Sequence, residues 1–501
     1  MLLYLESFGN PRNFARIARR MSCSKPIVAV KSGRTPAGER ATASHTGSLL
    51  AASDVSVDAL FRQSGVVRAS TLAEFLDVGA LLSREPLPSG PRVCVLTDAG
   101  GPGVLAADAC VSQGLVVPEP SAALRSALSG VLPAESALVN PIDLLATASP
   151  RDFARALDVV AASGEYDAVI AIAVHGTVAD AVAGAPTRSV PVLVVQMAGE
   201  RAPVPGGPPI FRFPESAARA LARAVEYAQW RSSPRGADPE FDDARPDDAA
   251  VVLAEAAAGG SRWLDPSETA TVLGAWGLPV VPGHRVESVE EVVAAAEAIA
   301  GAVAVKAITA GAVRKSEAGG VHLDVAGGAE AGIAARAIQA RNPDVTGFLV
   351  QPMIHGGAEM LVGVTQDPLF GPVVACGPGG ERAEIERDVA VRLTPVTSIE
   401  AASMVRELRT FPILDGWKGA PRLDVGALED LVMRLAALAD THPEVREIDL
   451  DPVKVLPRGA AVLDARIRVA PPDPEPLWPA IGASPPRAST LAGPTERWPS
   501  G

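Results

Sequence analysis

The chain has 501 residues, enough for about three domains of roughly 150 residues each. Its net charge of −13 argues against nucleic acid or an anionic membrane surface as a partner. Its four cysteines are scattered without CxxC spacing, and no apolar run reaches the ~18 residues that a membrane span needs. The chain does not start with the basic and apolar segments of a signal peptide, so we expect a cytoplasmic protein.

The first elements are predicted to be a strand, a helix and a second strand. Residues 2–5 form a short apolar run, and Glu6 follows at its carboxyl end, where open α/β sheets usually bind ligands. Apolar positions within 14–21 indicate a helix, and 26–30 indicate a buried strand. A strand at 2–5 would form an exposed edge unless something pairs with it.

The polar segment 31–47 holds the first candidate for chemistry, His45. Its first ten residues combine cations, which attract an anion, with glycines, which let the backbone bend close to it. A neutral imidazole in such a setting can attack phosphorus and carry a phosphoryl group covalently. A histidine in a polar loop is more often structural, so the local pattern leaves both interpretations open. A helix at 55–63 is expected to follow.

A boundary rich in proline at 86–91 precedes a second α/β unit. The segment 92–113 reads as a strand at 92–96, a turn at Gly100, Gly101 and Gly103, and an apolar helix from 104. A helix start attracts anions through its N–H groups and dipole, although a turn needed only for packing has the same pattern. Further apolar strands, which alternate with helices and so predict a doubly wound parallel sheet, are expected at 168–174 and 191–195.

A charged linker at 233–247 separates this sheet from a third domain. In that domain Lys306 ends a strand at 302–306, Lys315 lies in a loop containing glycines, and Asp451 and Asp464 come near the close. An ATP site requires cations for the phosphates and carboxylates for Mg²⁺. Each residue alone could be a solvated strand end or a hairpin position, but together they favour a nucleotide site.

In combination, these ordered motifs resemble the NDP-forming acyl-CoA synthetases, whose best-known members are ADP-forming acetate–CoA ligases and which are related to succinyl-CoA synthetase. The resemblance covers about residues 1–470. It rests on the segments 4–7, 31–34, 44–47, 100–104, 140–143, 315–321, 370–373 and 464–466. It implies an α/β protein in which flavodoxin-like, doubly wound parallel sheets of the succinyl-CoA synthetase type precede an ATP-grasp domain.

The resemblance also implies a domain order. The expected units are an incomplete flavodoxin domain with the phosphohistidine loop at 1–88, a second flavodoxin-like ligase domain at 89–232, the linker at 233–247, the ATP-grasp domain at 248–470 and a disordered proline-rich tail at 471–501. Family members usually begin with a CoA-binding domain and the first half of the flavodoxin domain, which this chain lacks. We therefore expect truncation at an internal methionine, a separate CoA-binding subunit, or loss of ligase activity.

The site residues that the resemblance implies fall into three groups. His45 is the phosphohistidine, and Glu6 accepts a hydrogen bond from its ring, which fixes the tautomer. The phosphate is cradled by Ser44, Thr46, Gly47, Gly100, Gly101 and Gly103. The nucleotide is bound by Lys306, Lys315 and Glu359, with an adenine hinge at Gln351, Pro352 and Met353, and Mg²⁺ is held by Asp451 and Asp464.

Some positions depart from the family pattern. Arg314 stands where ligases that shuttle phosphate between distant sites have a histidine, and arginine can hold a phosphate but cannot carry one covalently. His322 is near in sequence but belongs to the following strand. Asp451 replaces the common asparagine, which should not weaken Mg²⁺ binding, and Lys418 replaces an arginine that could make a planar contact to phosphate.

Two functions follow from these patterns. The first is an NDP-forming acid–CoA ligase, or a large fragment of one, that uses ATP or ADP with Mg²⁺ and coenzyme A as substrate. Its partners would be a small carboxylic acid or acyl-CoA, and a second copy of the chain or a separate CoA-binding subunit. The alternative, motivated by the missing CoA domain and Arg314, is a catalytically incomplete nucleotide-binding regulatory protein or partner subunit of the same family.

Overall fold

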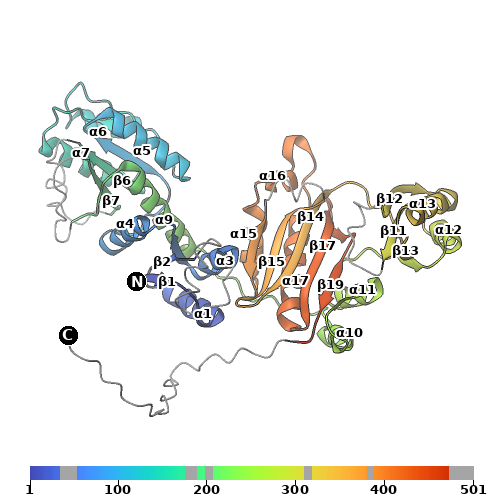
Figure 1. Ribbon diagram of the computed structural model, residues 1–501. Coiled ribbons are helices and arrows are strands. Elements are labelled where there is room, and N and C mark those ends of the chain that lie inside the picture. The colour runs from blue at the N-terminus through green and yellow to red at the C-terminus, as the bar shows by residue number, and fades with distance from the viewer. Residues whose placement is uncertain (34–53, 175–188, 198–206, 310–318, 381–387, 473–501) are drawn as a thin grey trace, which may run out of the picture.

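The computed structural model describes residues 1–33, 54–174, 189–197, 207–309, 319–380 and 388–472. Over these ranges the strands form sheets of three, five, four and seven strands. In Figure 1 the three-stranded and five-stranded sheets lie on the left, the seven-stranded sheet lies in the centre and the four-stranded sheet on the right. No helix within the described ranges is long and apolar enough to cross a membrane.

The three-stranded sheet, which we call the N-terminal sheet, is parallel with the order β1-β2-β3. Its middle strand is buried along its whole length, as its unbroken apolar run predicts. The edge strand carries Leu2 and Tyr4, which are 48% and 60% exposed, so the expectation of an exposed edge is confirmed. Its elements are β1 (Leu2–Leu5), α1 (Pro11–Ser22), β2 (Ile27–Lys31), α3 (Asp54–Ser64), β3 (Val66–Ala69) and α4 (Leu72–Arg84).

The five-stranded sheet is also parallel, with the order β5-β4-β6-β7-β8, and it confirms the predicted doubly wound pattern. Its strands are β4 (Val93–Thr97), β5 (Ile142–Asp143), β6 (Ala168–Ala173), β7 (Val192–Gln196) and β8 (Ile210–Phe211). Its helices are α5 (Gly100–Ser112), α6 (Ala122–Ser129), α7 (Pro150–Ala162) and α9 (Pro214–Ser232).

These two parallel sheets share one hydrophobic core. Phe75 of α4 and Leu221 of α9 belong to the same buried cluster as residues of β2 and β6. The Tyr227 hydroxyl of α9 donates a 2.6 Å hydrogen bond to the Ser22 carbonyl of α1. Burial of a continuous apolar cluster is the main stabilising term in folding, so the two sheets stabilise each other.

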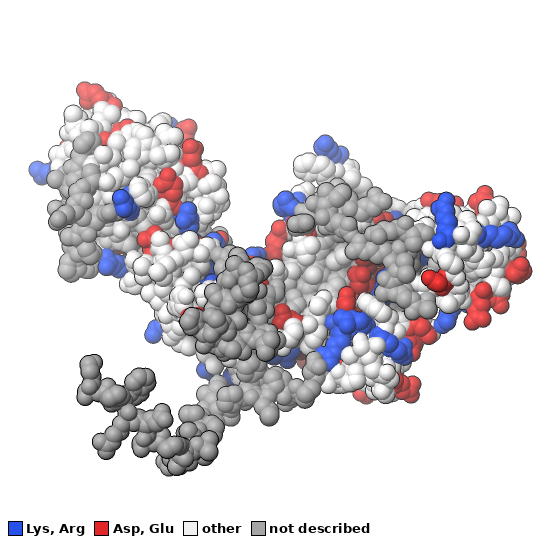
Figure 2. Space-filling model, in the orientation of Figure 1, with Lys and Arg blue, Asp and Glu red and all other residues white. Residues whose placement is uncertain are grey.

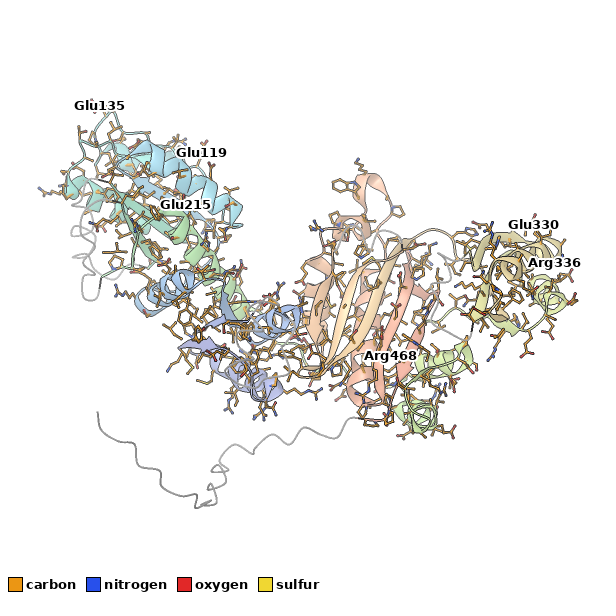
Figure 3. All side chains as sticks on the ribbon, viewed as in Figure 1. Glu119, Glu135, Glu215, Glu330, Arg336 and Arg468 are labelled. Atoms are coloured by element: carbon orange, nitrogen blue, oxygen red, sulfur yellow. The ribbon has the colours of Figure 1, made fainter. Side chains whose placement is uncertain are left out.

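The remaining two sheets form the third part of the chain. The four-stranded sheet, which we call the small lobe, is antiparallel in the order β10-β13-β11-β12, with α12 and α13 packed on one face. Its elements are β10 (His284–Val286), α12 (Val289–Ala298), β11 (Ala302–Thr309), β12 (Val321–Ala326), α13 (Gly327–Arg341) and β13 (Val345–Pro352). In Figure 3 Glu330 and Arg336 of α13 lie on the outer side of this lobe, which leaves the other sheet face toward the centre.

The seven-stranded sheet, which we call the large lobe, runs β16-β15-β14-β17-β19-β9, and β18 pairs with β17. Its strands are β9 (Arg262–Trp263), β14 (Ala358–Asp367), β15 (Gly371–Pro378), β16 (Ala390–Leu393), β17 (Val445–Val455), β18 (Ala460–Val462) and β19 (Arg466–Val469). Its helices are α10 (Pro246–Ala258), α11 (Pro266–Ala275), α15 (Ser398–Arg406), α16 (Phe411–Leu414) and α17 (Val425–Thr441). On the described part of the face in Figure 2, acidic side chains are scattered over all the lobes, while several basic side chains lie together at the lower part of the large lobe.

An aromatic cluster joins the N-terminal sheet to the large lobe. The ring of Phe8 contacts those of Phe14, Phe61 and Phe370, and the rings of Phe8 and Phe370 lie 5.7 Å apart in an edge-to-face arrangement. Such pairs stabilise a contact beyond the area that they bury. The motif at 370–373 therefore has a packing role at this joint.

His442 is a buried histidine that makes large-lobe stability depend on pH. Its Nε2 accepts a 3.2 Å hydrogen bond from Trp276 Nε1, and burial lowers its pKa. Because the folded pKa lies below the unfolded one, its stabilisation is complete above about pH 6.5 and is lost as the pH falls toward the folded value. We expect His442→Gln, which keeps an acceptor but does not titrate, to flatten the fall in unfolding free energy between pH 7.5 and 5.5 in urea titrations. Equal slopes in the two proteins would contradict this prediction.

Candidate functional site

Lys306 lies on the face of the small lobe that is turned toward the large lobe. Its neighbours Val305 and Ala307 belong to the core beneath α12 and α13, and side chains alternate along a strand. The Lys306 ammonium is buried and donates a 2.7 Å hydrogen bond to the carbonyl of Leu463, the residue before Asp464. Two predicted residues of the nucleotide site, Lys306 and Asp464, are therefore brought together from different lobes.

The predicted adenine hinge lies at the end of β13. Gln351 is buried, and its side-chain amide donates a 2.8 Å hydrogen bond to the Val281 carbonyl. The Met353 backbone N–H donates a 2.9 Å hydrogen bond to the Ala302 carbonyl. These bonds fix the segment Gln351–Met353 at the junction of the two lobes, which is where a hinge must lie.

Glu359 lies at the start of β14, opposite Lys454 of β17 in the sheet register. The Lys454 ammonium lies 3.7 Å from the Glu359 carboxylate and donates a 3.0 Å hydrogen bond to the Ile354 carbonyl. Lys454 thus ties Glu359 to the end of the hinge. The sequence pattern did not single out Lys454, because the contact depends on strand register rather than on a local motif.

Asp451 lies across the large-lobe sheet from two glycines. Its Oδ1 accepts a 2.9 Å hydrogen bond from the Gly380 N–H, and a Cβ added to Gly379 would lie 2.6 Å from the Met360 backbone and 3.0 Å from that oxygen. Glycine at 379 is therefore required for this close approach, and Gly380 has a positive φ of 65°, which also favours glycine. The sequence predicted Asp451 but did not assign these glycines a role.

The carboxylates at the close of the large lobe form a mutually repelling group. Burial raises the pKa of Asp449, and the charge of Asp451, opposed by Arg466 and reinforced by Asp464, raises it further. A divalent cation relieves such repulsion, and hard carboxylate oxygens suit Mg²⁺. Among the described residues no group of three or more acidic, histidine or cysteine ligands could hold a metal alone. Two protein carboxylates would leave coordination positions for phosphate and water.

The predicted cradle at Gly100, Gly101 and Gly103 lies in the first turn of α5, which begins four residues earlier than the sequence pattern indicated. Ala99 provides no side-chain cap for the helix start. A Cβ on Gly103 would lie 3.0 Å from Thr97 Cγ2, so the packing here is tight and favours glycine. A Cβ on Gly101 would meet no described atom within 4 Å, which leaves this side of the turn open to an anion.

Asp143 is a carboxylate beside this turn, in the segment 140–143 on which part of the family resemblance rests. A Cβ on Gly100 would lie 3.1 Å from Asp143 Oδ2, while Asp143 Oδ1 accepts a 2.8 Å hydrogen bond from the Leu145 N–H. Leu145 has a φ of 67°, an uncommon conformation for a residue other than glycine. Strained positions of this kind cluster at functional sites.

For the predicted phosphoryl carrier, the structure describes only the residues on either side of its segment. His45, with Ser44, Thr46 and Gly47, lies outside the described residues, as do Arg314 and Lys315. Glu6 follows β1 and is exposed. Near it, Ser32 donates backbone and side-chain hydrogen bonds of 3.0 and 3.3 Å to the Leu5 carbonyl, which ties the ends of β1 and β2 together. His322 lies in β12, paired with Val305, as its place after the loop predicted.

Lys418 lies in a strained, exposed loop. It has a φ of 55° between two glycines of positive φ, Gly416 and Gly419. Its ammonium lies 5.9 Å from the ring centroid of Trp417, which is 59% exposed. A cation over an exposed indole is attracted by the ring face.

Comparisons with known proteins agree with this architecture. Residues 255–469 match the family model of the ATP-grasp domain, and residues 1–82 match that of the succinyl-CoA ligase like flavodoxin domain. The chain is 34% identical over 482 residues to acetate–CoA ligase [ADP-forming] I of Archaeoglobus fulgidus, a match that covers 93% of this chain and 69% of that protein.

Another relative is divided between two chains. Subunit α of acetate–CoA ligase [ADP-forming] II of Pyrococcus furiosus is 36% identical over 244 residues, which cover 45% of this chain and 53% of that subunit. Subunit β of the same enzyme is 34% identical over 229 residues, which cover 44% of this chain and 97% of that subunit.

A solved structure is similar to part of the chain. It is a dinucleotide-forming acetyl-coenzyme A synthetase 1 of Ca. Korarchaeum cryptofilum in complex with coenzyme A and Mg-AMPPCP. The match has a TM-score of 0.40 and 31% identity, and it covers 44% of this chain and 99% of that one. On the family models and the long match to the A. fulgidus enzyme, this chain belongs to the family of ADP-forming acid–CoA ligases, as its ordered motifs predicted.

Proposed function

We propose that the chain is an NDP-forming acid–CoA ligase, or the larger part of one, which couples acyl-CoA and acyl-phosphate exchange to ATP and ADP through His45. One observation carries the proposal beyond family membership. The buried Lys306 of the small lobe reaches the backbone beside Asp464 of the large lobe. The charges of Asp451 and Asp464 both act on Asp449 and raise its pKa. A cation and paired carboxylates at the junction of two lobes suit a nucleotide with its magnesium ion.

In this proposal each step moves a phosphoryl or acyl group between named partners. A ring nitrogen of His45 attacks the γ-phosphorus of ATP, the bond to the β-phosphate oxygen breaks, and ADP leaves. The carboxylate of the acid then attacks that phosphorus and breaks the N–P bond, which gives an acyl phosphate and free His45. The thiolate of coenzyme A attacks the acyl carbon and releases phosphate. Splitting the transfer in this way replaces one difficult step by easier ones.

The residues of this chain bind and orient in these steps. Lys306 and Lys315 neutralise phosphate charge, Glu359 and the hinge at Gln351, Pro352 and Met353 place the nucleotide, and Glu6 fixes the tautomer of His45. Asp451 and Asp464 would hold Mg²⁺, which lowers the charge repulsion between the nucleotide phosphates and the attacking group. Ser44, Thr46, Gly47 and the open side of the α5 turn would receive the phosphorylated ring.

The proposal includes a protein partner. Relatives of this family occur with separate α and β subunits, and this chain spans parts that match both. A separate CoA-binding subunit, or a second copy of this chain, is therefore part of the proposal, with a small carboxylic acid or acyl-CoA as the substrate and the cytoplasm as the compartment.

A second candidate is a nucleotide-binding regulatory protein of the same family. It is favoured by Arg314, which stands where shuttling ligases have a histidine and which cannot carry phosphate. In that case the nucleotide site would bind ATP without passing the phosphoryl group to His45.

A labelling and chase experiment separates the two candidates. We expect the purified protein to take up acid-labile label from γ-labelled ATP with Mg²⁺, and ADP to return the label to ATP. Acetate, coenzyme A and a CoA-binding subunit of the family should release the label that remains on the protein as inorganic phosphate. Nucleotide binding without any label would contradict the ligase and favour the regulatory protein.

A further inference from the structure

Helix α3 is shared between the N-terminal sheet and the large lobe. It begins at Asp54, nine positions after His45 in the sequence. Its buried residues Leu60 and Phe61 belong to one cluster with Phe370 and Leu393 of the large lobe. The element that follows the histidine segment is therefore packed into both parts of the molecule.

Gln63 of α3 covers the open edge of the large-lobe sheet. Strand β16 is the last strand on that side, so its outward backbone groups have no neighbouring strand in the described sheet. The Gln63 side-chain amide accepts a 2.8 Å hydrogen bond from the Leu393 N–H and donates a 3.0 Å bond to the Leu393 carbonyl. A side-chain amide thus replaces a missing strand, which fixes α3 in register with β16.

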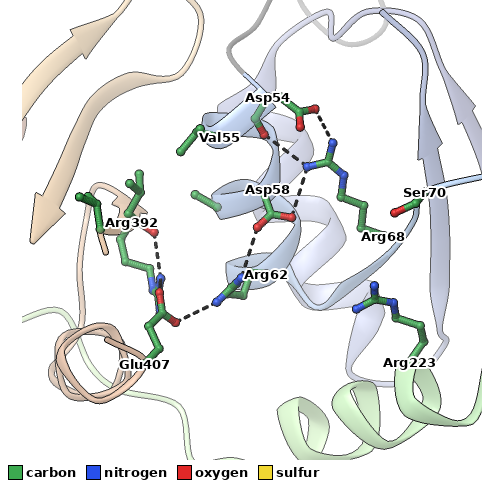
Figure 4. Close-up of a pocket in the computed structure, with 12 residues that line it drawn as sticks. Asp54, Val55, Asp58, Arg62, Arg68, Ser70, Arg223, Arg392 and Glu407 are labelled. Atoms are coloured by element: carbon green, nitrogen blue, oxygen red, sulfur yellow. Dashed lines mark hydrogen bonds and ion pairs between the residues drawn. The ribbon is translucent and has the colours of Figure 1, made fainter. Parts of the chain in front are cut away.

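A chain of ion pairs runs beside these hydrogen bonds (Figure 4). Arg68 of β3 contacts Asp54 and lies 3.2 Å from Asp58. Arg62 lies 3.3 Å from Asp58 and 2.8 Å from Glu407, which follows α15 of the large lobe. The Glu407 carboxylate is held in turn by two 2.8–2.9 Å hydrogen bonds from the buried guanidinium of Arg392 on β16.

The residues around the cavity between these groups, about 370 Å³ in volume, connect the N-terminal sheet to the large lobe and do not form a ligand site. It is lined by four arginines, Arg62, Arg68, Arg223 and Arg392. Each has a carboxylate partner, Glu74 and Glu226 being those of Arg223. An entering anion would have to displace a carboxylate from an arginine, which opposes its binding.

We propose that Arg62 and Gln63 are positioning residues for phosphoryl transfer, because they fasten the carboxyl flank of the histidine segment to the lobe that holds the nucleotide. This inference rests on the proposed function of His45. Nine residues span at most about 30 Å, so the place of Asp54 limits where the His45 ring can reach. Loosening α3 would spread the positions of this anchor, and a misplacement of about 1 Å can slow a reaction greatly.

The test compares Arg62→Gln, the double variant R62Q/Q63A, Arg62→Lys and the control Arg245→Gln. Arg245 forms an exposed ion pair with Asp248 on α10, so its variant removes a comparable charge away from the joint. Hydrogen–deuterium exchange of α3 and β16 reports whether the joint is fastened. Single-turnover labelling from γ-labelled ATP reports the transfer rate and its half-saturating ATP concentration.

We expect the α3 amides of R62Q/Q63A to exchange about tenfold faster and labelling to slow about tenfold, with unchanged half-saturation. Arg62→Gln should lie between the double variant and the wild type, while Arg62→Lys and Arg245→Gln should match the wild type. If the α3 amides of the double variant exchange at the wild-type rate, Arg62 and Gln63 do not hold α3 against the large lobe. If those amides exchange faster but the labelling rate is unchanged, the two residues do not position the histidine segment for transfer. If the wild-type protein takes up no label from ATP, the proposed function is overturned, and the role of Arg62 and Gln63 in phosphoryl transfer is overturned with it. Hydrogen–deuterium exchange would still show whether the two residues hold α3 against β16.

Discussion

Replacing His45 by alanine is expected to abolish exchange of labelled ADP into ATP, with a loss of at least about 10³-fold. This half-reaction needs only the nucleotide site and the phosphoryl acceptor, so it is independent of the acid and of coenzyme A. Nucleotide affinity should not change, because Lys306 and Asp451 belong to β11 and β17, which are far from His45 in the sequence. Exchange is measured by separating the nucleotides after incubation with Mg²⁺.

His322→Ala is the matched control for this prediction. His322 lies in β12 of the small lobe and pairs with Val305, the neighbour of Lys306, so it is a histidine that could compete for the role. We expect the control variant to keep exchange within about threefold of the wild type. Exchange that survives in His45→Ala but disappears in His322→Ala would assign the phosphoryl carrier to β12 instead.

Replacing Asp451 by alanine is expected to slow the same exchange about 10²-fold and to raise the Mg²⁺ concentration that it needs. The substitution removes one of two proposed metal ligands and leaves the Gly380 N–H without its acceptor. The rate is measured as a function of Mg²⁺ at saturating ATP.

Asp451→Asn separates these effects from a general loss of structure. The amide oxygen can accept the Gly380 hydrogen bond and can ligate the metal, and asparagine is common at this position in the family that the sequence resembles. We expect exchange within about fivefold of the wild type. An asparagine variant as slow as the alanine variant would mean that the negative charge of Asp451, rather than its oxygen, is essential.

Much of the fold could be predicted because buried parallel strands are apolar on both faces. Four strands were predicted within one residue at each end: β2, β4, β6 and β7, from the apolar runs at 26–30, 92–96, 168–174 and 191–195. Long-range packing was not predictable in this way. The core shared by α4 and α9 and the contact of Gln63 with Leu393 join residues far apart in the sequence.

In the candidate site too, residues that belong to a local pattern could be predicted, and residues that depend on long-range contacts could not. Lys306, Asp451 and Asp464 could be named because a lysine in a strand and late carboxylates are a chemical pattern, and the structure brings Lys306 beside Leu463. The prediction that Lys306 ends its strand was wrong, because β11 continues to Thr309 in its pairing with β13. Lys454 and Asp143 were missed as site residues, since their roles depend on strand register and on the approach of a distant helix turn. Gly103 was predicted as part of an anion cradle, and the structure adds a packing reason for glycine, because a Cβ there would lie 3.0 Å from Thr97 Cγ2.

In the proposed reaction a phosphoryl group moves from the nucleotide of the ATP-grasp domain to His45. The most direct test is to incubate the protein with ATP and Mg²⁺, digest it at neutral to basic pH, and locate the added phosphoryl group by fragment mass spectrometry. We expect one acid-labile phosphate, on His45, that disappears when ADP is added before digestion. A phosphate on another residue, or an unmodified peptide containing His45 despite bound nucleotide, would contradict it.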